Sequence, residues 1–388
     1  MRFSIFHVLY PIAIGWTIRL TFFLGLWTRL DYNDDGCKLL KGGGEMVGSE
    51  DFAIGKFQNI FVTQGDLHTC FDHGSLKAKP GNIWFINVKR DKEDIRKVHL
   101  KGYPNAENFH PHGMYISNKT DLLYVTNHVQ TYSGVEIFKI DYSNSPDTIT
   151  LLHQHTVKSE LFLPYAPNDV VEGKGKGELY VTMWLPFGYP RGGRKHPANM
   201  EQRIKKSLMM PLNVFGIKLT NVYYCTWNKD DPSKNKCVVA KGSQNYGMAN
   251  GISINTKRTN LFVNDVTFKT IHKYAINPVD ASLSHLEKIS LDYPADNIEF
   301  MEDGDLVLGT MPHMYKLAMN DLQAGIYPAV PGGMSRIYLG DNGTYTTRHV
   351  VMHKGDKLSQ IAAATSWGET IYLGSPFNSG VLMCKSPQ

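Results

Sequence analysis

Oxygen-bearing side chains stand directly before apolar runs at several places in this chain of 388 residues. Asn168 and Asp169, for example, precede the β-branched pair Val170 and Val171. A carboxylate at the mouth of an apolar strand is costly to bury unless it has a partner. Such polar clusters recur six times; they are "GSED" at Gly48, "HPHG" at His110, "PND" at Pro167, "ANG" at Ala249, "ADN" at Ala295 and "LSQ" at Leu358.

The chemistry of these clusters is that of hard-cation ligands. Carboxylates and amide carbonyls suit such a cation, and a flexible oxygen shell suits Ca²⁺ better than Mg²⁺. Neither a cysteine nor an HExxH motif lies among them. Each residue alone is most simply explained as part of a turn or cap. Together they predict two bound Ca²⁺ ions, because unpaired carboxylates on one axis would repel. The residues are Glu50, Asp51, Asn168, Asp169, Asn250, Asp296 and Asn297.

Two histidines accompany these oxygens. His112 begins one predicted strand, in "HPHG", and His128 ends the following run, "YVTNH". In antiparallel neighbours these positions can meet at the same end of a sheet. A lone histidine is usually structural, but a pair beside a Ca²⁺-bound water is a workable general base. The cation would polarise a carbonyl and stabilise an oxyanion.

The elements that must position these residues are short strands. Between Asp31 and Gln388, β-rich runs dominate, broken by Gly, Asn, Asp and Pro. About a dozen residues after each polar cluster comes an apolar run; the runs are "FVTQG", "YVTNH", "YVTMW", "FVNDV", "VLGTM" and "YLGSP". This recurrence predicts an all-β, six-bladed propeller. The polar clusters would begin the innermost strands and converge on one axis, whereas the alternative is six unrelated strand-start turns.

Five cysteines indicate an oxidising compartment. Cys37 and Cys384 bracket almost the whole folded region, and a disulfide between them would close the propeller over a very long loop. Cys225 and Cys237 flank a predicted hairpin tip and could form a second bridge. Cys70 is left over.

The N-terminus predicts targeting to the secretory pathway. The stretch from Phe3 to Trp27 is mostly apolar and long enough to span a bilayer. A signal anchor over residues 1–30 is favoured over a cleaved signal, because no small-residue cleavage site follows. Arg19 counts against the anchor, and Pro11 counts against a third alternative, a buried helix. The propeller would occupy residues 31–388 in the lumen or outside the cell.

The charge of the chain and its short sequence motifs indicate which binding partners, modifications and locations to expect. The net charge is only +5, and Lys and Arg are scattered, so nucleic-acid binding is not indicated. Two N-x-S/T sequons, at Asn118 and Asn342, are candidate glycosylation sites. The sequence has no KDEL-like tail, which would indicate retention in the endoplasmic reticulum. The endoplasmic reticulum and the cell surface therefore both remain open as the final location.

With these motifs in their order, the chain from about Asp31 onward resembles the paraoxonase family of calcium-dependent lactonases and arylesterases. The resemblance implies a catalytic calcium, a structural calcium, a catalytic His pair and a closing disulfide between Cys37 and Cys384. By this resemblance the catalytic calcium is held by Glu50, Asn168, Asn250, Asp296 and Asn297, and the structural calcium by Asp51, Asp169 and the carbonyl of Met114. His112 and His128 are similar to the His pair. The family's retained N-terminal segment also favours an uncleaved anchor.

The chain departs from the family pattern at two places. Met183, Trp184 and Leu185 stand where family enzymes have Asn-Asp-His, and Thr310 and Met311 stand where they have Cys-His. A longer insertion, about residues 185–224, corresponds to a helical lid that contacts membrane or lipoprotein in the family. Its stretch "MEQRIKKSLMMPLNVF" could be such an amphipathic element or a helix packed on the propeller.

Two functions therefore remain open. The first is a hydrolase of small lactones or aryl esters that uses Ca²⁺ and the His pair. The second is implied by membrane-anchored paraoxonase-like proteins of nematodes, which assist folding, assembly or surface delivery of an ion-channel subunit of the epithelial sodium channel class. The intact His pair favours the enzyme.

Overall fold

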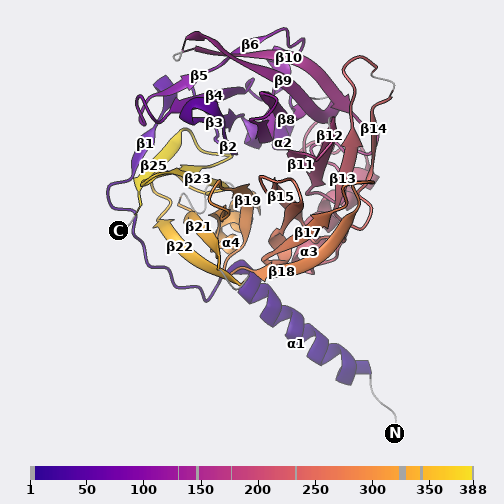
Figure 1. Cartoon of the computed structure of the whole chain (residues 1–388). Helices are drawn as coiled ribbons and strands as arrows, with labels where there is room; N and C mark the ends of the chain where they lie inside the picture. The colour runs from indigo at the N-terminus through magenta and orange to yellow at the C-terminus, as the bar shows by residue number, and fades with distance from the viewer. Residues whose placement is uncertain are drawn as a thin grey trace.

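The computed structural model describes residues 5–129, 131–145, 148–175, 177–231, 234–322, 329–340 and 344–386. Within them, six sheets surround a common centre, so the predicted six-bladed propeller is confirmed (Figure 1). Each blade begins with an inner strand near the axis and continues outward through antiparallel neighbours. Asn342 lies outside the described residues.

Blades 1 to 3 contain the following strands, from the inside outward. Blade 1 has β2 (Phe52–Ile54), β3 (Asn59–Gln64), β4 (Asn82–Asn87) and β5 (Ile95–Lys97). Blade 2 has β7 (Pro111–Ser117), β8 (Leu122–Val129), β9 (Tyr132–Ser145), β10 (Thr148–Lys158) and β6 (His99–Lys101). Blade 3 has β11 (Pro167–Glu172), β12 (Glu178–Met183), β13 (Asn221–Thr226) and β14 (Lys236–Val239).

Blades 4 to 6 follow the same plan. Blade 4 has β15 (Ala249–Ile254), β16 (Asn260–Asp265), β17 (Thr270–Ile276) and β18 (Leu283–Ser290). Blade 5 has β19 (Ala295–Phe300), β20 (Leu306–Thr310), β21 (Gly332–Leu339) and β22 (Tyr345–His353). Blade 6 has β23 (Ala363–Trp367), β24 (Thr370–Gly374), β25 (Val381–Lys385) and, outermost, β1 (Lys38–Leu40).

The recurring sequence pattern maps onto this plan as predicted. The apolar runs form the second strand of every blade, and the polar clusters stand at or just before the inner strands. Blade 2 has five strands where the other blades have four, because β6 pairs in parallel with β10 at its outer edge. Strand β6 lies in the chain that leaves blade 1, and it covers the outer edge that β10 would otherwise expose.

Both ends of the chain complete blade 6. Strand β1 pairs with β25, so a strand from the start of the fold completes the blade formed by its end. The disulfide between Cys37 and Cys384 joins the same two segments across 347 residues of sequence. The disulfide between Cys225 and Cys237 links the paired strands β13 and β14. Both predicted disulfides are confirmed, and Cys70 is buried with a free thiol.

Four helices of the described chain lie outside the sheets: α1 (Ile5–Leu24), α2 (Leu67–His73), α3 (Met200–Val214) and α4 (Met314–Leu322). Helix α1 projects away from the propeller in Figure 1, with its C-terminal end against the blades. Trp16 on α1 contacts Phe215 beyond α3, with ring centroids 5.5 Å apart. The helices within the described residues do not include one both long and apolar enough to cross a membrane. The single-pass anchor therefore stays a prediction.

We predict that opening the long disulfide costs more stability than opening the short one. In the chain-entropy model, a bridge spanning 347 residues contributes about 6 kcal/mol and one spanning 12 residues about 3 kcal/mol. The double variant Cys37→Ala/Cys384→Ala should therefore lower the free energy of unfolding more than Cys225→Ala/Cys237→Ala in urea titrations. Equal losses would show that the blade contacts, and not the covalent closure, hold blade 6.

Candidate functional site

The side chains at the axis are aimed by irregularities at the start of the inner strands. In β7, β11, β15 and β19, the pairing with the next strand shifts register near the first residues. A bulge of this kind leaves residues unpaired and re-aims their side chains. Because of it, the neighbours Asn168 and Asp169 both lie buried near the axis instead of pointing to opposite faces.

Two glycines in these bulges allow the blades to approach. A Cβ atom at Gly113 would lie 2.6 Å from the backbone oxygen of Asn168, and one at Gly251 would lie 2.6 Å from the backbone nitrogen of Ile298. Real Cβ atoms do not come this close to a neighbouring blade's backbone. The glycines of "HPHG" and "ANG" are therefore needed for the convergence of blades 2 with 3 and 4 with 5.

Five of the predicted ligands share an unusual feature. Each has a buried side-chain oxygen without a hydrogen-bond partner, although such atoms are normally satisfied. The atoms are Glu50 Oε2, Asn168 Oδ1, Asn250 Oδ1, Asp296 Oδ1 and Asn297 Oδ1. They are the residues predicted to hold the catalytic calcium, and a shared deficit of this kind fits a hard cation with oxygen ligands.

The side-chain nitrogens of two of these asparagines already have hydrogen-bond partners. Asn297 Nδ2 donates to the backbone oxygen of Glu50 at 2.8 Å and to Glu50 Oε1 at 2.9 Å. Asn168 Nδ2 lies 3.5 Å from His112 Nε2. The carbonyl oxygens are thereby left as the free ends of both side chains, so contacts between blades orient the cation-facing atoms before any cation arrives.

Asp51 and Asp169 form a second group, whose oxygens have backbone partners. Asp51 Oδ2 accepts from the Met114 N–H at 2.7 Å, and Asp169 Oδ2 accepts from the Ile252 N–H at 2.9 Å. Each carboxylate thus links its own blade to the next. Burial raises the pKa of both groups well above the usual range, and the nearby Glu50 carboxylate adds to this effect. The sequence predicts that Met114 binds the structural calcium through its backbone carbonyl. In the structure, the contact between Met114 and Asp51 is made by the Met114 backbone N–H.

A further carboxylate, Glu299, was not predicted. It lies on β19 two residues after Asn297, and its charge acts on both Asp51 and Asp169. Burial raises the pKa of Glu299 to about 8 and, together with Glu50, that of Asp296 to about 7. Strand alternation would have found Glu299, because residues i and i+2 share a face of a strand.

The two histidines meet as predicted. His112 Nδ1 lies 3.0 Å from His128 Nε2, and His112 Nε2 lies 3.3 Å from Glu50 Oε1. Burial lowers the pKa of His128 well below its usual value, helped by the positive charge that His112 can carry. Burial opposes protonation of His112 too, but the Glu50 and Asp296 carboxylates outweigh it and raise the pKa of that imidazole. Of the pair, His112 is therefore the member that takes up a proton.

Residues that sequence analysis missed complete the surroundings of the His pair. Ser133 Oγ lies 3.3 Å from His128 Nδ1 and accepts from the Tyr165 N–H at 3.0 Å. The ring of Phe71, from α2, lies 5.7 Å from that of His112 and 5.6 Å from that of His128. No local sequence pattern reveals Phe71, because its position depends on how α2, which connects β3 to β4 within blade 1, packs against the histidines of blade 2.

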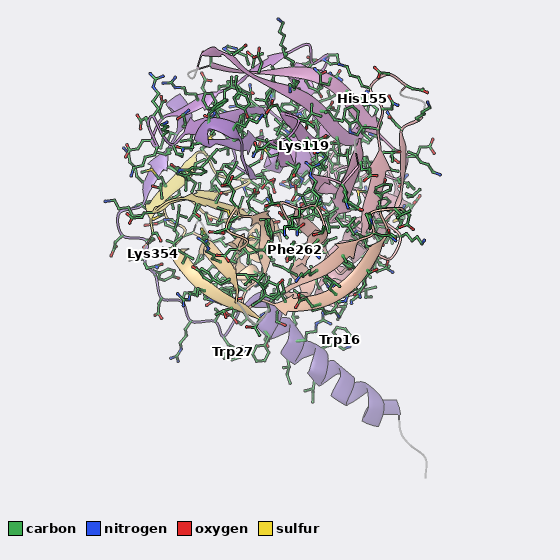
Figure 2. All side chains as sticks on the ribbon, in the orientation of Figure 1. Trp16, Trp27, Lys119, His155, Phe262 and Lys354 are labelled. Carbon is green, nitrogen blue, oxygen red and sulfur yellow. A yellow bond between two sulfur atoms is a disulfide. The ribbon has the colours of Figure 1, made fainter. Side chains whose placement is uncertain are left out.

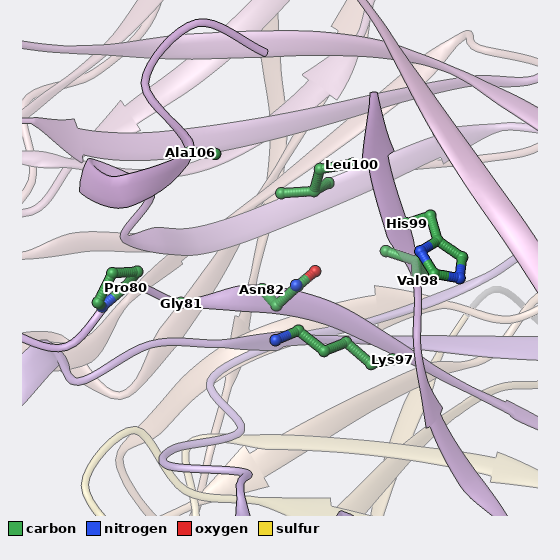
Figure 3. A pocket seen from close by; sticks show the side chains of 8 residues that line it. All are labelled: Pro80, Gly81, Asn82, Lys97, Val98, His99, Leu100 and Ala106. Atoms are coloured by element: carbon green, nitrogen blue, oxygen red, sulfur yellow. The ribbon is translucent and has the colours of Figure 1, made fainter. Parts of the chain in front are cut away.

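Other predicted sites lie away from the axis. Asn118 is exposed at the end of the β7–β8 hairpin, where its Nδ2 donates to the Ile54 carbonyl at 3.3 Å, so its place on the surface suits a glycosylation acceptor. A cavity of about 480 Å³ lies between blades 1 and 2, where Asn82, Lys97 and His99 line it (Figure 3). It contains none of the predicted cation ligands.

The site thus consists of a buried His pair beside five unpartnered oxygens at the axis of a six-bladed propeller. The family model described as arylesterase matches residues 34–189 and 198–384, and the chain belongs to this arylesterase (paraoxonase) family. Serum paraoxonase/arylesterase 2 of Bos taurus is 27% identical over 350 residues, covering 88% of this chain and 86% of the relative. The Homo sapiens protein of that name is 30% identical over 289 residues, 74% of this chain and 72% of the relative.

A solved structure of a gluconolactonase from Xanthomonas campestris is also similar. It covers 90% of this chain and 89% of its own, with 13% identity and a TM-score of 0.47.

We predict different consequences for the neighbours Asn168 and Asp169. Asp169→Ala removes the acceptor for the buried Val170 and Ile252 amides and should destabilise the fold by about 2–5 kcal/mol. Asn168→Ala removes an oxygen that has no protein partner and should cost much less in chelator. Urea unfolding of both variants measures the difference. If the two melt alike, the proposed separation into a fold-supporting and a cation-facing residue is wrong.

The cation-free protein should lose stability as the pH rises. The pKa values of Asp51, Asp169 and Asp296 are raised in the folded state, so the folded protein binds more protons than the unfolded chain. The associated stability is fully present below the unfolded pKa of about 4 and is lost as the pH rises through the folded values, about 7 for Asp296. Thermal melts in chelator from pH 5 to 8 should show the decline, and Ca²⁺ should reverse it. A flat profile in chelator would contradict the burial of these charges.

Proposed function

We propose that this protein is a calcium-dependent hydrolase of small lactones or aryl esters. The main observation behind this proposal is the 3.0 Å contact between His112 and His128. This pair lies directly beside the five buried oxygens that have no hydrogen-bond partner. Membership of the arylesterase family supports the class of reaction. The names of relatives, which include both arylesterase and lactonase, support the two substrate types.

The site residues have separate roles in this proposal, as calcium ligands or as acid–base groups. Glu50, Asn168, Asn250, Asp296 and Asn297 would hold one Ca²⁺, and Asp51, Asp169 and Met114 a second that stabilises the fold. When bound, calcium supplies a Lewis acid for the substrate carbonyl. His112 Nε2 faces the site and takes a proton from the attacking water, while His128 accepts a hydrogen bond from His112 Nδ1 and stabilises the resulting imidazolium. The proton then passes to the leaving alkoxide or phenoxide.

The compartment that fits this proposal is the secretory pathway. Two disulfides require an oxidising environment, and the relatives are named as serum proteins. Helices α1 and α3 carry exposed large apolar side chains; they include Ile14, Ile18, Phe22, Met200, Ile204 and Leu208. Trp27, just beyond α1, is 74% exposed, and Figure 2 labels it at the end of α1 that meets the propeller. These side chains support attachment to a membrane surface, with or without an N-terminal anchor.

One observation favours a second candidate function. The His pair is closed off, with His112 5% exposed and His128 fully buried beneath Phe71. Trp184, which stands where family enzymes have a polar residue, adds a ring 6.5 Å from that of His112. A propeller with a sealed His pair suits a non-catalytic protein that assists assembly or surface delivery of an ion-channel subunit, with calcium acting only on the fold.

A lactone panel distinguishes the two functions. The full chain in detergent should hydrolyse at least one lactone or aryl ester in Ca²⁺ and none in chelator. His112→Gln should lower kcat by a factor of about 10²–10⁴, since it removes a general base, and Glu50→Gln should abolish activity. His349→Gln, outside the axis, is the matched control and should leave the rate unchanged. Absence of activity across the panel, with channel delivery unaffected by His112→Gln, would favour the assembly function.

A further inference from the structure

The inner strands carry a layer of residues that lies farther from the His pair than the predicted calcium ligands. In every blade, one inner-strand residue pairs with the first residue of the apolar run on the second strand. These six equivalent residues, which we call the lower layer, are Ala53, Tyr115, Val171, Ser253, Glu299 and Thr365. In blades 1 and 3 the lower layer follows Asp51 and Asp169 by two residues, so it lies on the same side of the strand, about 6–7 Å further along it.

Glu299 is the carboxylate of the lower layer, and it lies close to the axis. Its charge acts on Asp51 in blade 1, Tyr115 in blade 2 and Asp169 in blade 3, although its own strand, β19, belongs to blade 5. An influence on three other blades requires a central position. Among the described residues, no group forms a hydrogen bond or ion pair with this carboxylate. A carboxylate removed from water is normally paired or bound to a metal, so this one needs a partner from outside the chain.

Two hydroxyl groups of the lower layer flank Glu299. Ser253 Oγ, on β15, accepts from the N–H of Phe300, the residue that follows Glu299, at 2.9 Å. Thr365, on β23 at the other side of β19, is fully buried, and its Oγ1 has no hydrogen-bond partner within the described residues. Strands β15, β19 and β23 lie next to one another around the centre of the propeller (Figure 1). Glu299 keeps part of its surface accessible to water, so water molecules can reach this group of oxygens.

The negative charge on the axis exceeds what two Ca²⁺ ions neutralise. When all are ionised, five carboxylates contribute five negative charges, against four positive charges from two Ca²⁺; they are Glu50, Asp51, Asp169, Asp296 and Glu299. Arg258 acts on Tyr115, but it does not neutralise the remaining charge, because its guanidinium pairs with Glu172 in blade 3. Of the five carboxylates, Glu299 is the one without a protein partner among the described residues, so we assign the remaining charge to it.

We propose that Glu299 binds a third Ca²⁺ on the axis, in the lower layer, with the Thr365 and Ser253 hydroxyls as neutral ligands and water completing the shell. Oxygen ligands and a flexible, partly hydrated shell suit this cation. The site offers one carboxylate, where each of the two predicted calcium positions has two, so its affinity is lower than theirs. The expected dissociation constant is roughly 10⁻⁴–10⁻³ M, the range of extracellular calcium modules. That range suits the oxidising compartment that the two disulfides indicate.

The calcium stoichiometry of the full chain tests this site. Equilibrium dialysis of the chain in detergent against radioactive calcium should give about two bound ions at micromolar calcium and about three at about 5 mM. Glu299→Gln keeps the shape of the side chain and removes its charge, so it should retain the two tight ions and lose the third. Thr365→Val removes the unpartnered hydroxyl and should weaken the third ion roughly tenfold, with the tight ions unchanged. Thermal melts in chelator check folding, and Glu299→Gln should melt no lower than the wild type, because it removes an unpaired charge.

Glu302→Gln is the matched control, because it removes an exposed carboxylate from the same blade and should keep all three ions. The inference is overturned if the wild type stops at two ions, or if the third ion survives Glu299→Gln. It is also overturned if Glu299→Gln weakens only a tight ion, since Glu299 would then act on the calcium at Asp51 and Asp169. A chain without tight calcium would overturn the proposed calcium-dependent hydrolase instead, and the comparison of the wild type with Glu299→Gln at millimolar calcium would still decide the third site.

Discussion

The burial of several negative charges around one axis is the constraint on which the rest of the structure depends. Asp51 in blade 1, Asp169 in blade 3 and Asp296 in blade 5 have pKa values raised by burial, and the charge of Glu50 adds to the effect on all three. Glu299, whose pKa burial also raises, completes the group. Within the described residues, these carboxylates form one ion pair, between Glu50 and His112. A fold that assembles such a cluster requires either protons or cations at its centre.

The same charges also hold the blades in register. Asp51 joins blade 1 to blade 2 and Asp169 joins blade 3 to blade 4, each through a backbone N–H. Asn297 joins blade 5 back to blade 1 through Glu50. Site and scaffold therefore use the same atoms, and loss of a cation from the axis affects contacts between blades as well as chemistry.

Much of this arrangement could be predicted from sequence, because it repeats. The polar clusters and the apolar runs that follow them recur at nearly constant offsets, and this recurrence identified the blades, the inner strands and the meeting of His112 with His128. What depends on long-range geometry could not be predicted. Phe71 reaches the His pair only because α2, from blade 1, packs against blade 2. Ser133 is close to His128 in sequence, but it lies opposite that histidine only because β8 and β9 pair in one register. The parallel pairing of β6 with β10 likewise joins segments about 50 residues apart in the chain, as Thr150 with His99.

The pairing of β1 with β25 imposes an order on biosynthesis. Strand β1 and Cys37 are synthesised early, yet their partners are made last, 347 residues later for the disulfide. At a rate of synthesis of about 5–20 residues per second, roughly 20–70 s pass between the synthesis of β1 and that of its partner β25. During that interval the Cys37 thiol coexists with those of Cys70, Cys225 and Cys237 as each emerges. Correct bridging thus depends on the nascent chain keeping its first cysteine unreacted until its last strand is released.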